Sequence, residues 1–240
     1  MDGLPSVGII STGAYCADEV PVGIPRQRGG ADRRAAPVLA AAAARRAIDA
    51  AGVAPEQLSC VVVAACVSDG AQRAVAIDVR RLIGANQATA FDANMAYGGF
   101  VHALTMAEGL LRREPVGAYA LVVGTGVRAD AGAVVLGPVP RGRGTISTSL
   151  LTGGDVAAAV GDVLKRAGVA RQEVRHMLVQ EPVVSVPVAL DRLCRQGRLG
   201  DGDIVVICAV GGGGSIGCGL LRWAGTRAGR PWTLTERCSL

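Results

Sequence analysis

The chain has 240 residues, of which 50% are apolar, 3% are aromatic and 19% are charged, and it carries a formal charge of +5. The arginines behind this charge are scattered through amphipathic segments without interleaved aromatic residues, which argues against a nucleic-acid-binding surface. Two histidines and seven cysteines without CxxC spacing provide no zinc-like ligand set, so we expect no metal and no cofactor.

The cysteines lie mostly inside apolar runs, as Cys60, Cys66, Cys208 and Cys218 do, which is typical of reduced core thiols. The first residues lack the basic region and apolar core of a signal peptide, and together these features predict a cytoplasmic protein. The uncharged stretch 204–221 contains six glycines. We therefore interpret it as two strands joined by a glycine loop, not as a membrane span.

Hydrophobic periodicity and glycine punctuation predict the order β-α-β-α-β-α-β-β in the first half of the chain. The expected strands are 6–10, 59–67, 88–92, 119–124 and 131–136, and the expected helices are 38–51, 73–83 and 98–113. The last of these helices has an apolar face predicted to consist of Phe100, Val101, Leu104, Met106, Ala107, Leu110 and Leu111.

The pattern then begins again, with expected strands at 145–151, 177–179, 204–209 and 215–223 and helices at 156–167 and 187–196. The sequence Ala51-Gly52-Val53-Ala54 recurs as Ala167-Gly168-Val169-Ala170, which indicates an internal duplication. The second copy is shorter after its second strand, so one helix and one strand are expected to be missing, and an edge strand is one whose loss a fold can survive. We predict an α/β fold of two duplicated halves, 1–140 and 141–240, in a layered α/β/α/β/α sandwich.

The segment 91–100 follows a short apolar strand and opens a helix, which is the pattern of a nucleophile elbow. An elbow holds one side chain at a helix N-terminus, where peptide dipoles and free N–H groups stabilise an anion. A cysteine at this place would be activated as a thiolate. The residue present is Tyr97, whose phenol has a reference pKa of about 10 and accepts acyl groups poorly near neutral pH.

Several weak motifs occur in one collinear order, namely 7–15, 41–52, 61–64, 91–100, 119–124, 131–136, 144–148, 185–191 and 210–223. In this order the chain resembles the thiolase-fold ketoacyl-acyl-carrier-protein synthase III enzymes of fatty acid and polyketide initiation. The resemblance implies a thiolase-like fold and a Cys-His-Asn triad whose cysteine is acylated. Here the cysteine position is Tyr97, and the second key position is Gln180 in either plausible register.

The resemblance also implies that parts of the family's active site remain in this chain. The backbone N–H groups of Gly212 and Tyr97 would form an oxyanion hole, although glycines are equally needed wherever two strands turn tightly. Cys66, Cys16 and Glu181 are candidate substitutes for the lost nucleophile or base, with core packing or solvation as the alternative reading. We interpret His102 and His176 as structural.

We therefore expect a ketosynthase III-like pseudoenzyme that acts as a non-catalytic partner subunit, similar to a chain-length factor. Family dimers pair through the strand before the elbow, here Ala88, Thr89, Ala90, Phe91 and Asp92, so we expect a dimer, with an active ketosynthase as the candidate partner for a hetero-dimer. Acyl-CoA or an acyl carrier protein is the expected further partner, with no nucleic acid and no membrane. The alternatives are an atypical acyltransferase or hydrolase with a relocated nucleophile, and a homodimeric acyl-binding scaffold.

Overall fold

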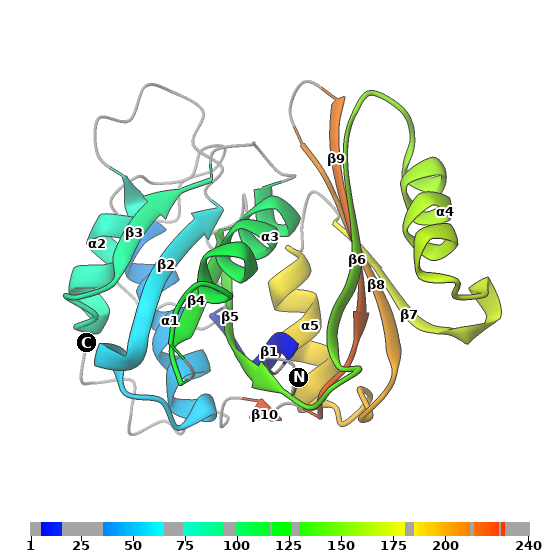
Figure 1. Cartoon of the computed structure of the whole chain (residues 1–240). Helices are drawn as coiled ribbons and strands as arrows, with labels where there is room; N and C mark the ends of the chain where they lie inside the picture. The colour runs from blue at the N-terminus through cyan, green and yellow to red at the C-terminus, as the bar shows by residue number, and fades with distance from the viewer. Residues whose placement is uncertain are drawn as a thin grey trace.

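The fold consists of two β-sheets separated and covered by helices (Figure 1). The computed structural model describes residues 6–15, 36–64, 74–93, 99–115, 117–125, 130–180, 185–211, 214–225 and 227–228.

The first sheet has the strand order β10-β1-β5-β4-β2-β3. Its strands are β1 (Ser6–Tyr15), β2 (Leu58–Ala64), β3 (Thr89–Asp92), β4 (Tyr119–Thr125), β5 (Ala131–Val139) and β10 (Arg227–Ala228). The helices between them are α1 (Ala36–Ala51), α2 (Val75–Ile83) and α3 (Gly99–Leu111). Strands β3, β2 and β4 run parallel, whereas β5 is antiparallel to both β4 and β1. The predicted element order of the first half is therefore confirmed.

The second sheet has the strand order β6-β9-β8-β7. Its strands are β6 (Gly144–Thr152), β7 (Val174–Val179), β8 (Ile204–Val210) and β9 (Ser215–Arg222), and its helices are α4 (Val156–Ala167) and α5 (Val186–Arg195). Two short 3-10 helices, Pro55–Gln57 and Arg171–Glu173, precede β2 and β7. The uncharged stretch 204–221 consists of β8, β9 and their connection. No helix among the described residues is long and apolar enough to cross a membrane.

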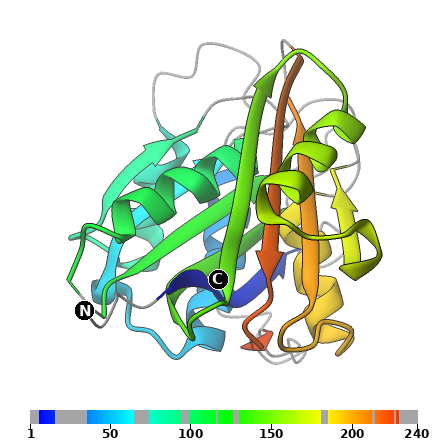
Figure 2. The ribbon, with the colours of Figure 1, turned by 45° about the vertical axis from the view of Figure 1, so that its right-hand side comes forward.

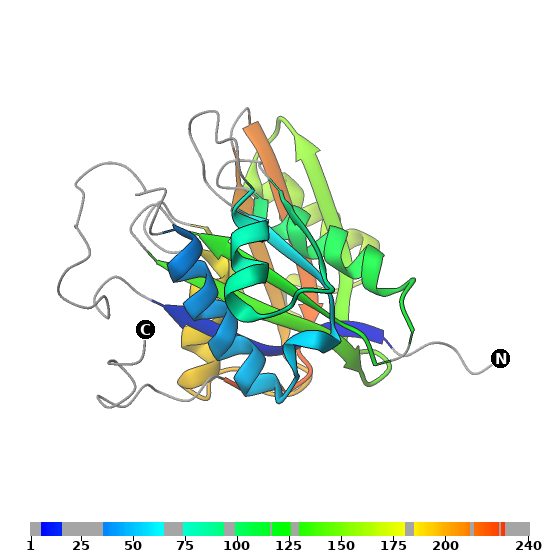
Figure 3. The same cartoon turned by 90° about the vertical axis from the view of Figure 1, so that its left-hand side faces the viewer.

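The helices form three layers around the two sheets (Figures 1 and 3). Helices α1 and α2 cover the outer face of the first sheet, α3 and α5 lie between the sheets, and α4 covers the outer face of the second. Strand β2 is buried on both faces, because Val61 and Val63 pack toward α1 and α2 while Val62 packs toward α3. The α/β/α/β/α sandwich is confirmed.

The two halves repeat one another in backbone detail. At the ends of α1 and α4, Gly52 and Gly168 adopt left-handed φ angles of 67° and 62°. After each glycine a 3-10 turn is closed in the same way: the Ala54 N–H donates to Gln57 Oε1 at 2.9 Å, and the Ala170 N–H donates to Glu173 Oε1 at 2.7 Å. This correspondence supports the predicted duplication. The division into domains at residue 140 stays a prediction.

The sheet orders show which strand the second half lacks. The order β1-β5-β4-β2-β3 of the first half corresponds to β6-β9-β8-β7 of the second, so the counterpart of the edge strand β3 is missing. Helix α2, which precedes β3, also has no counterpart among the described elements. The loss of one helix and one edge strand, expected from the short connection after the second strand of this half, is thereby confirmed.

Three details of the fold differ from the sequence expectations. Strand β1 extends to Tyr15, five residues beyond the predicted end, and the two-residue β10 adds to it in parallel. On α3, Met106 and Leu110 are 47% and 37% exposed, although both were placed on the buried apolar face. Glu108 occupies that buried face instead and is only 6% exposed.

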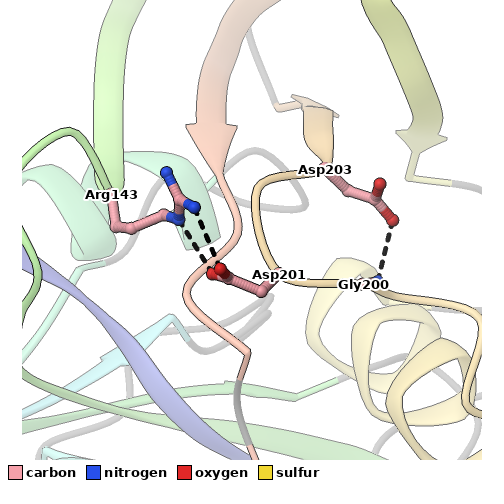
Figure 4. A network of polar contacts seen from close by, with 4 residues as sticks. All are labelled: Arg143, Gly200, Asp201 and Asp203. Atoms are coloured by element: carbon pink, nitrogen blue, oxygen red, sulfur yellow. Dashed lines mark hydrogen bonds and ion pairs between the residues drawn. The ribbon is translucent and has the colours of Figure 1, made fainter.

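Polar contacts link two loops at one end of the second sheet, the turn before β6 and the loop between α5 and β8 (Figure 4). Arg143, before β6, forms a two-point ion pair with Asp201, with Nε–Oδ1 and Nη2–Oδ2 distances of 2.8 and 2.9 Å. Asp203 Oδ2 accepts a hydrogen bond of 2.8 Å from the Gly200 N–H. The loop that follows α5 is thus fixed to the turn between β5 and β6, which joins the two sheets.

Candidate functional site

The elbow lies where the parallel strands β2 and β3 end and α3 begins. The Ala93 N–H donates to the Val63 carbonyl at 2.8 Å, so sheet pairing continues to the last residue before the turn. A Cβ atom at Gly99 would lie 2.8 Å from the Ala93 carbonyl oxygen and 3.2 Å from Ala64 Cβ. Only glycine fits there, and the helix therefore starts directly against the strand ends. Residues 94–98, with Tyr97, lie outside the described residues.

Helix α5 points its N-terminus toward the same place. A Cβ atom at Gly124, near the end of β4, would lie 2.9 Å from Pro187 Cγ of α5 and 3.4 Å from Phe100 Cδ2 of α3. At the start of β5, a Cβ at Gly132 would lie 2.6 Å from the Val188 nitrogen. Glycines thus allow the first turns of α3 and α5 to converge on the ends of the central strands. Helix N-termini concentrate free N–H groups and positive potential.

Asp92, the last residue of β3, holds the N-terminus of α2. Its carboxylate accepts hydrogen bonds from the Val75 and Ala76 N–H groups at 2.8 and 2.7 Å. The residue before this helix, Ala74, has no side chain that could cap it. Burial raises the pKa of Asp92, and the two backbone hydrogen bonds oppose that rise. Asp92 is therefore a structural residue that fixes α2 against the strand leading into the elbow.

Gln180 immediately follows β7, as the resemblance requires for a residue at a strand end. Its N–H donates to the Cys208 carbonyl at 2.7 Å, and the residue is partly buried. On the neighbouring strands, the Gly211 N–H donates to the Ser215 carbonyl at 2.6 Å, which closes the connection from β8 to β9. Gly212 and Glu181 lie outside the described residues, as do Cys16 and Cys66. Their predicted roles stay predictions.

The two histidines occupy structural surroundings. His176 on β7 has Nε2 3.0 Å from the Arg198 carbonyl oxygen and 3.7 Å from Asp203 Oδ2. His102 is buried on α3 against β9, where a Cβ at Gly217 would lie 3.2 Å from its Nδ1. Both placements agree with the structural interpretation. Among the described residues, no group of three or more His, Cys, Asp or Glu side chains is arranged to hold a metal ion.

Glu108 is the buried acid that the sequence interpretation missed. It lies on α3 and accepts a hydrogen bond from the Thr145 hydroxyl of β6, so it links the two halves; both elements are in view in Figure 2. Burial raises its pKa from 4.5 to about 7, opposed by this hydrogen bond and by Arg112. Among the thiols, burial raises the pKa of Cys60 to about 11, so Cys60 is protonated near neutral pH and is a poor nucleophile.

Comparison with known proteins shows what the chain is similar to. Residues 182–223, which include α5, β8 and β9, match the model of the 3-oxoacyl-[acyl-carrier-protein] synthase III C-terminal family. The beta-ketoacyl-[acyl-carrier-protein] synthase III of Sphingopyxis alaskensis is 27% identical over 266 residues, which cover 77% of this chain and 83% of that protein. The 3-oxoacyl-[acyl-carrier-protein] synthase III of Aquifex aeolicus superposes with a TM-score of 0.76 at 20% identity, covering 91% of this chain and all of that one.

The chain has the fold of the ketoacyl-ACP synthase III structures and is similar in sequence to those enzymes. A further relative of this ketoacyl-ACP synthase III-like protein, the acetoacetyl CoA synthase NphT7 of Streptomyces sp. strain CL190, is 34% identical over 173 residues. That match covers 58% of this chain and only 52% of the relative. The alignment with the Sphingopyxis enzyme is longer than the whole of this chain, so that enzyme has segments opposite gaps here. The ketoacyl-ACP synthase III-like chain is thus a shortened form.

Proposed function

We propose that this protein is a ketosynthase III-like pseudoenzyme that serves as a non-catalytic partner subunit in fatty acid or polyketide-type biosynthesis. The observation that carries the proposal is Tyr97 at the position where the family resemblance places the acylated cysteine. A phenol has a reference pKa of about 10, so near neutral pH it is almost wholly protonated and a poor acyl acceptor. Gln180 at the second key position supports the same conclusion, because an amide is not a general base.

The scaffold around the elbow is retained although its nucleophile is replaced. Gly99, Gly124 and Gly132 still permit the close approach of α3 and α5 to the strand ends. A subunit that only supports a partner has to keep its backbone geometry but does not need its own nucleophile. The proposed role is to brace a neighbouring active subunit, with Tyr97 closing this subunit's own pocket.

The edge strand β3 is the proposed contact with that neighbour. It pairs with β2 along Thr89–Asp92, and in the described structure no strand pairs with its other side. Because the Ala93 N–H points to β2, the N–H groups of Ala90 and Asp92 point away from it and are free to pair with another chain. Met106 and Leu110, exposed on α3, add apolar surface on the helix that packs against β2.

The test combines this protein with a ketosynthase III that carries the intact triad, and measures heterodimer formation by native mass spectrometry. Ala90→Pro removes an outward N–H without removing a hydrogen bond to β2, so it should abolish the heterodimer. Ala90→Val keeps the N–H and serves as the matched control. A heterodimer with wild type and Ala90→Val, but not with Ala90→Pro, is the expected result.

Two other outcomes would overturn the proposal. A stable homodimer that excludes the active ketosynthase would favour the acyl-binding scaffold. Turnover of acyl-CoA or acyl carrier protein by this chain alone would favour a relocated nucleophile. A Tyr97→Cys variant adds a separate check of the pocket: acylation of the new thiol would show that the pocket still admits an acyl donor and that Tyr97 is what blocks the chemistry.

A further inference from the structure

Cys208 and Cys218 form a pair of buried thiols on neighbouring strands. Cys208 on β8 is directly opposite Cys218 on β9 in the antiparallel register. Their sulfur atoms are 2.7 Å apart, and both residues are 0% exposed. Neither of them forms a disulfide. The pair is therefore in close contact without a covalent bond.

The local hydrogen-bond pattern favours a covalent bond between them. The Cys208 carbonyl accepts the N–H of Gln180, the residue after β7, so the backbone polar groups of Cys208 point toward β7 and not toward β9. Cys208 and Cys218 are thus a non-hydrogen-bonded pair, the kind in which opposite Cα atoms are closest, at about 4.5 Å. That separation lies at the near end of the range of roughly 4.4–6.8 Å found for disulfides.

We propose that Cys208 and Cys218 are a redox modification site that forms a reversible cross-strand disulfide. The oxidant is a low-molecular-mass disulfide. The Cys208 thiolate attacks one sulfur of the oxidant and releases its first thiolate; the Cys218 thiolate then attacks the Cys208 sulfur and releases the second. The two protein thiols lose two electrons and two protons in total. The oxidant gains both and becomes two thiols.

The two sulfurs are unequal in a way that suits this order of attack. The contact between the two sulfurs lowers the pKa of Cys208, opposed by burial, whereas the same contact together with burial raises the pKa of Cys218. Cys60 is also buried, but it lies on β2 in the other sheet. Burial raises its pKa to about 11. Cys60 is therefore a suitable matched control for a buried thiol without the paired geometry.

Helix α4 controls access to the pair. Ala159, Val163 and the two cysteines belong to one buried cluster, so an oxidant reaches the sulfurs only when α4 separates from the sheet or before it has packed. The disulfide would tie β8 to β9 on the outer face of the second sheet. On the inner face, a Cβ at Gly217 of β9 would lie 2.9 Å from Val101 Cβ, so the tied hairpin supports the start of α3.

The test is incubation of the full chain in a buffer of oxidised and reduced glutathione, followed by alkylation of free thiols and digestion with trypsin. Arg198 and Arg222 flank the pair with no lysine or arginine between them, so both cysteines are released in the single peptide 199–222. A disulfide appears there as two unalkylated cysteines and a mass lower by about 2 Da. A parallel sample is refolded from urea in the same buffer, which removes the barrier imposed by α4.

The expected result is the disulfide in the refolded sample, slower formation in the folded sample, and reversal by dithiothreitol. It should be absent from Cys208→Ser and Cys218→Ser and unaffected by Cys60→Ser. The oxidised protein should melt a few degrees higher than the reduced one, because the bond constrains the unfolded chain. Two alkylated cysteines in peptide 199–222 from the refolded sample, or pairing of either cysteine with a different peptide, would overturn the proposal.

Discussion

The two halves of the molecule began from one pattern and now differ at one edge. In the first, β2 is followed by α2 and β3, and Asp92 at the end of β3 caps α2. In the second, β7 is followed directly by the connection to α5, and β7 itself is the edge of the sheet. A strand and its helix are thus absent together from the periphery of the second half, while the central helices α3 and α5 are both present.

The packing of α5 against the first sheet should be the contact most sensitive to added volume. Gly132→Ala would place a methyl group 2.6 Å from the Val188 nitrogen and 2.7 Å from the Pro187 carbonyl carbon, both of them backbone atoms of α5. We expect a loss of about 3 kcal/mol in the free energy of unfolding, because a backbone cannot move aside as a flexible side chain can. Urea denaturation measures it. A loss no greater than that of an ordinary surface substitution would show that the halves are not packed this closely.

The link between the halves at Glu108 should depend on pH. Its pKa is raised from 4.5 to about 7 in the folded protein, so folding favours the protonated acid. Its contribution to stability is complete below pH 4.5 and is lost as the pH rises through 7. By pH 8 the wild type should have lost about 3 kcal/mol through this group. Glu108→Gln stays neutral, and its stability should therefore exceed that of the wild type at pH 8 but not at pH 4.5. Equal pH profiles for the two proteins would exclude a buried, shifted Glu108.

The two helix caps provide a direct contrast between the halves. Asp92 caps α2 from another strand with two hydrogen bonds, whereas Asp155 caps α4 from the adjacent position with one hydrogen bond of 2.6 Å to Ala158. Asp92→Ala should cost about 2 kcal/mol and Asp155→Ala about 1 kcal/mol. Urea denaturation of both variants in one buffer makes the comparison. The reverse order would mean that Asp92 does not hold α2 in place.

The smallest expected effect is a gain in stability. Gly161 lies on the exposed side of α4, and no atom lies within 4 Å of a Cβ built on it. Gly161→Ala should raise the free energy of unfolding by about 0.5–1 kcal/mol, because alanine loses less backbone entropy in a helix. Comparing the change in the free energy of unfolding for Gly161→Ala and Gly132→Ala distinguishes a glycine that packing requires from one that it does not. A loss of stability would show that α4 is more crowded than its surroundings indicate.

Local chemistry made most of the fold predictable. A run of β-branched residues predicts β2, and the glycines that follow α1 and α4 predict where these helices end. All three elements lie within a few positions of their expected bounds. The extension of β1 was missed because Ser11 and Thr12 are polar. In the fold both are buried, with Ser11 donating to the Ala47 carbonyl at 2.6 Å and Thr12 to Asp191 Oδ1 at 2.9 Å. Such distant partners leave no local signal.

The candidate site was predictable only as far as motifs reach. Strand, turn and helix identified the elbow, and the structure places Gly99 and Pro187 where the two helices converge. The position of Glu108 could not be predicted, because helical spacing assigns Met106 and Leu110 to an apolar face without revealing that β6 approaches from the other side. Glu108 therefore became the buried residue through packing between the halves.

The most direct test of the central claim is intact-protein mass spectrometry after incubation with a panel of acyl-CoA and acyl-carrier-protein donors. An active ketosynthase III is loaded in parallel as the positive control. We predict that this protein gains no acyl group while the control becomes acylated. A stoichiometric acyl adduct on the wild-type chain would contradict the account, and peptide mapping would then identify the nucleophile, with Cys16 and Cys66 the first to be examined.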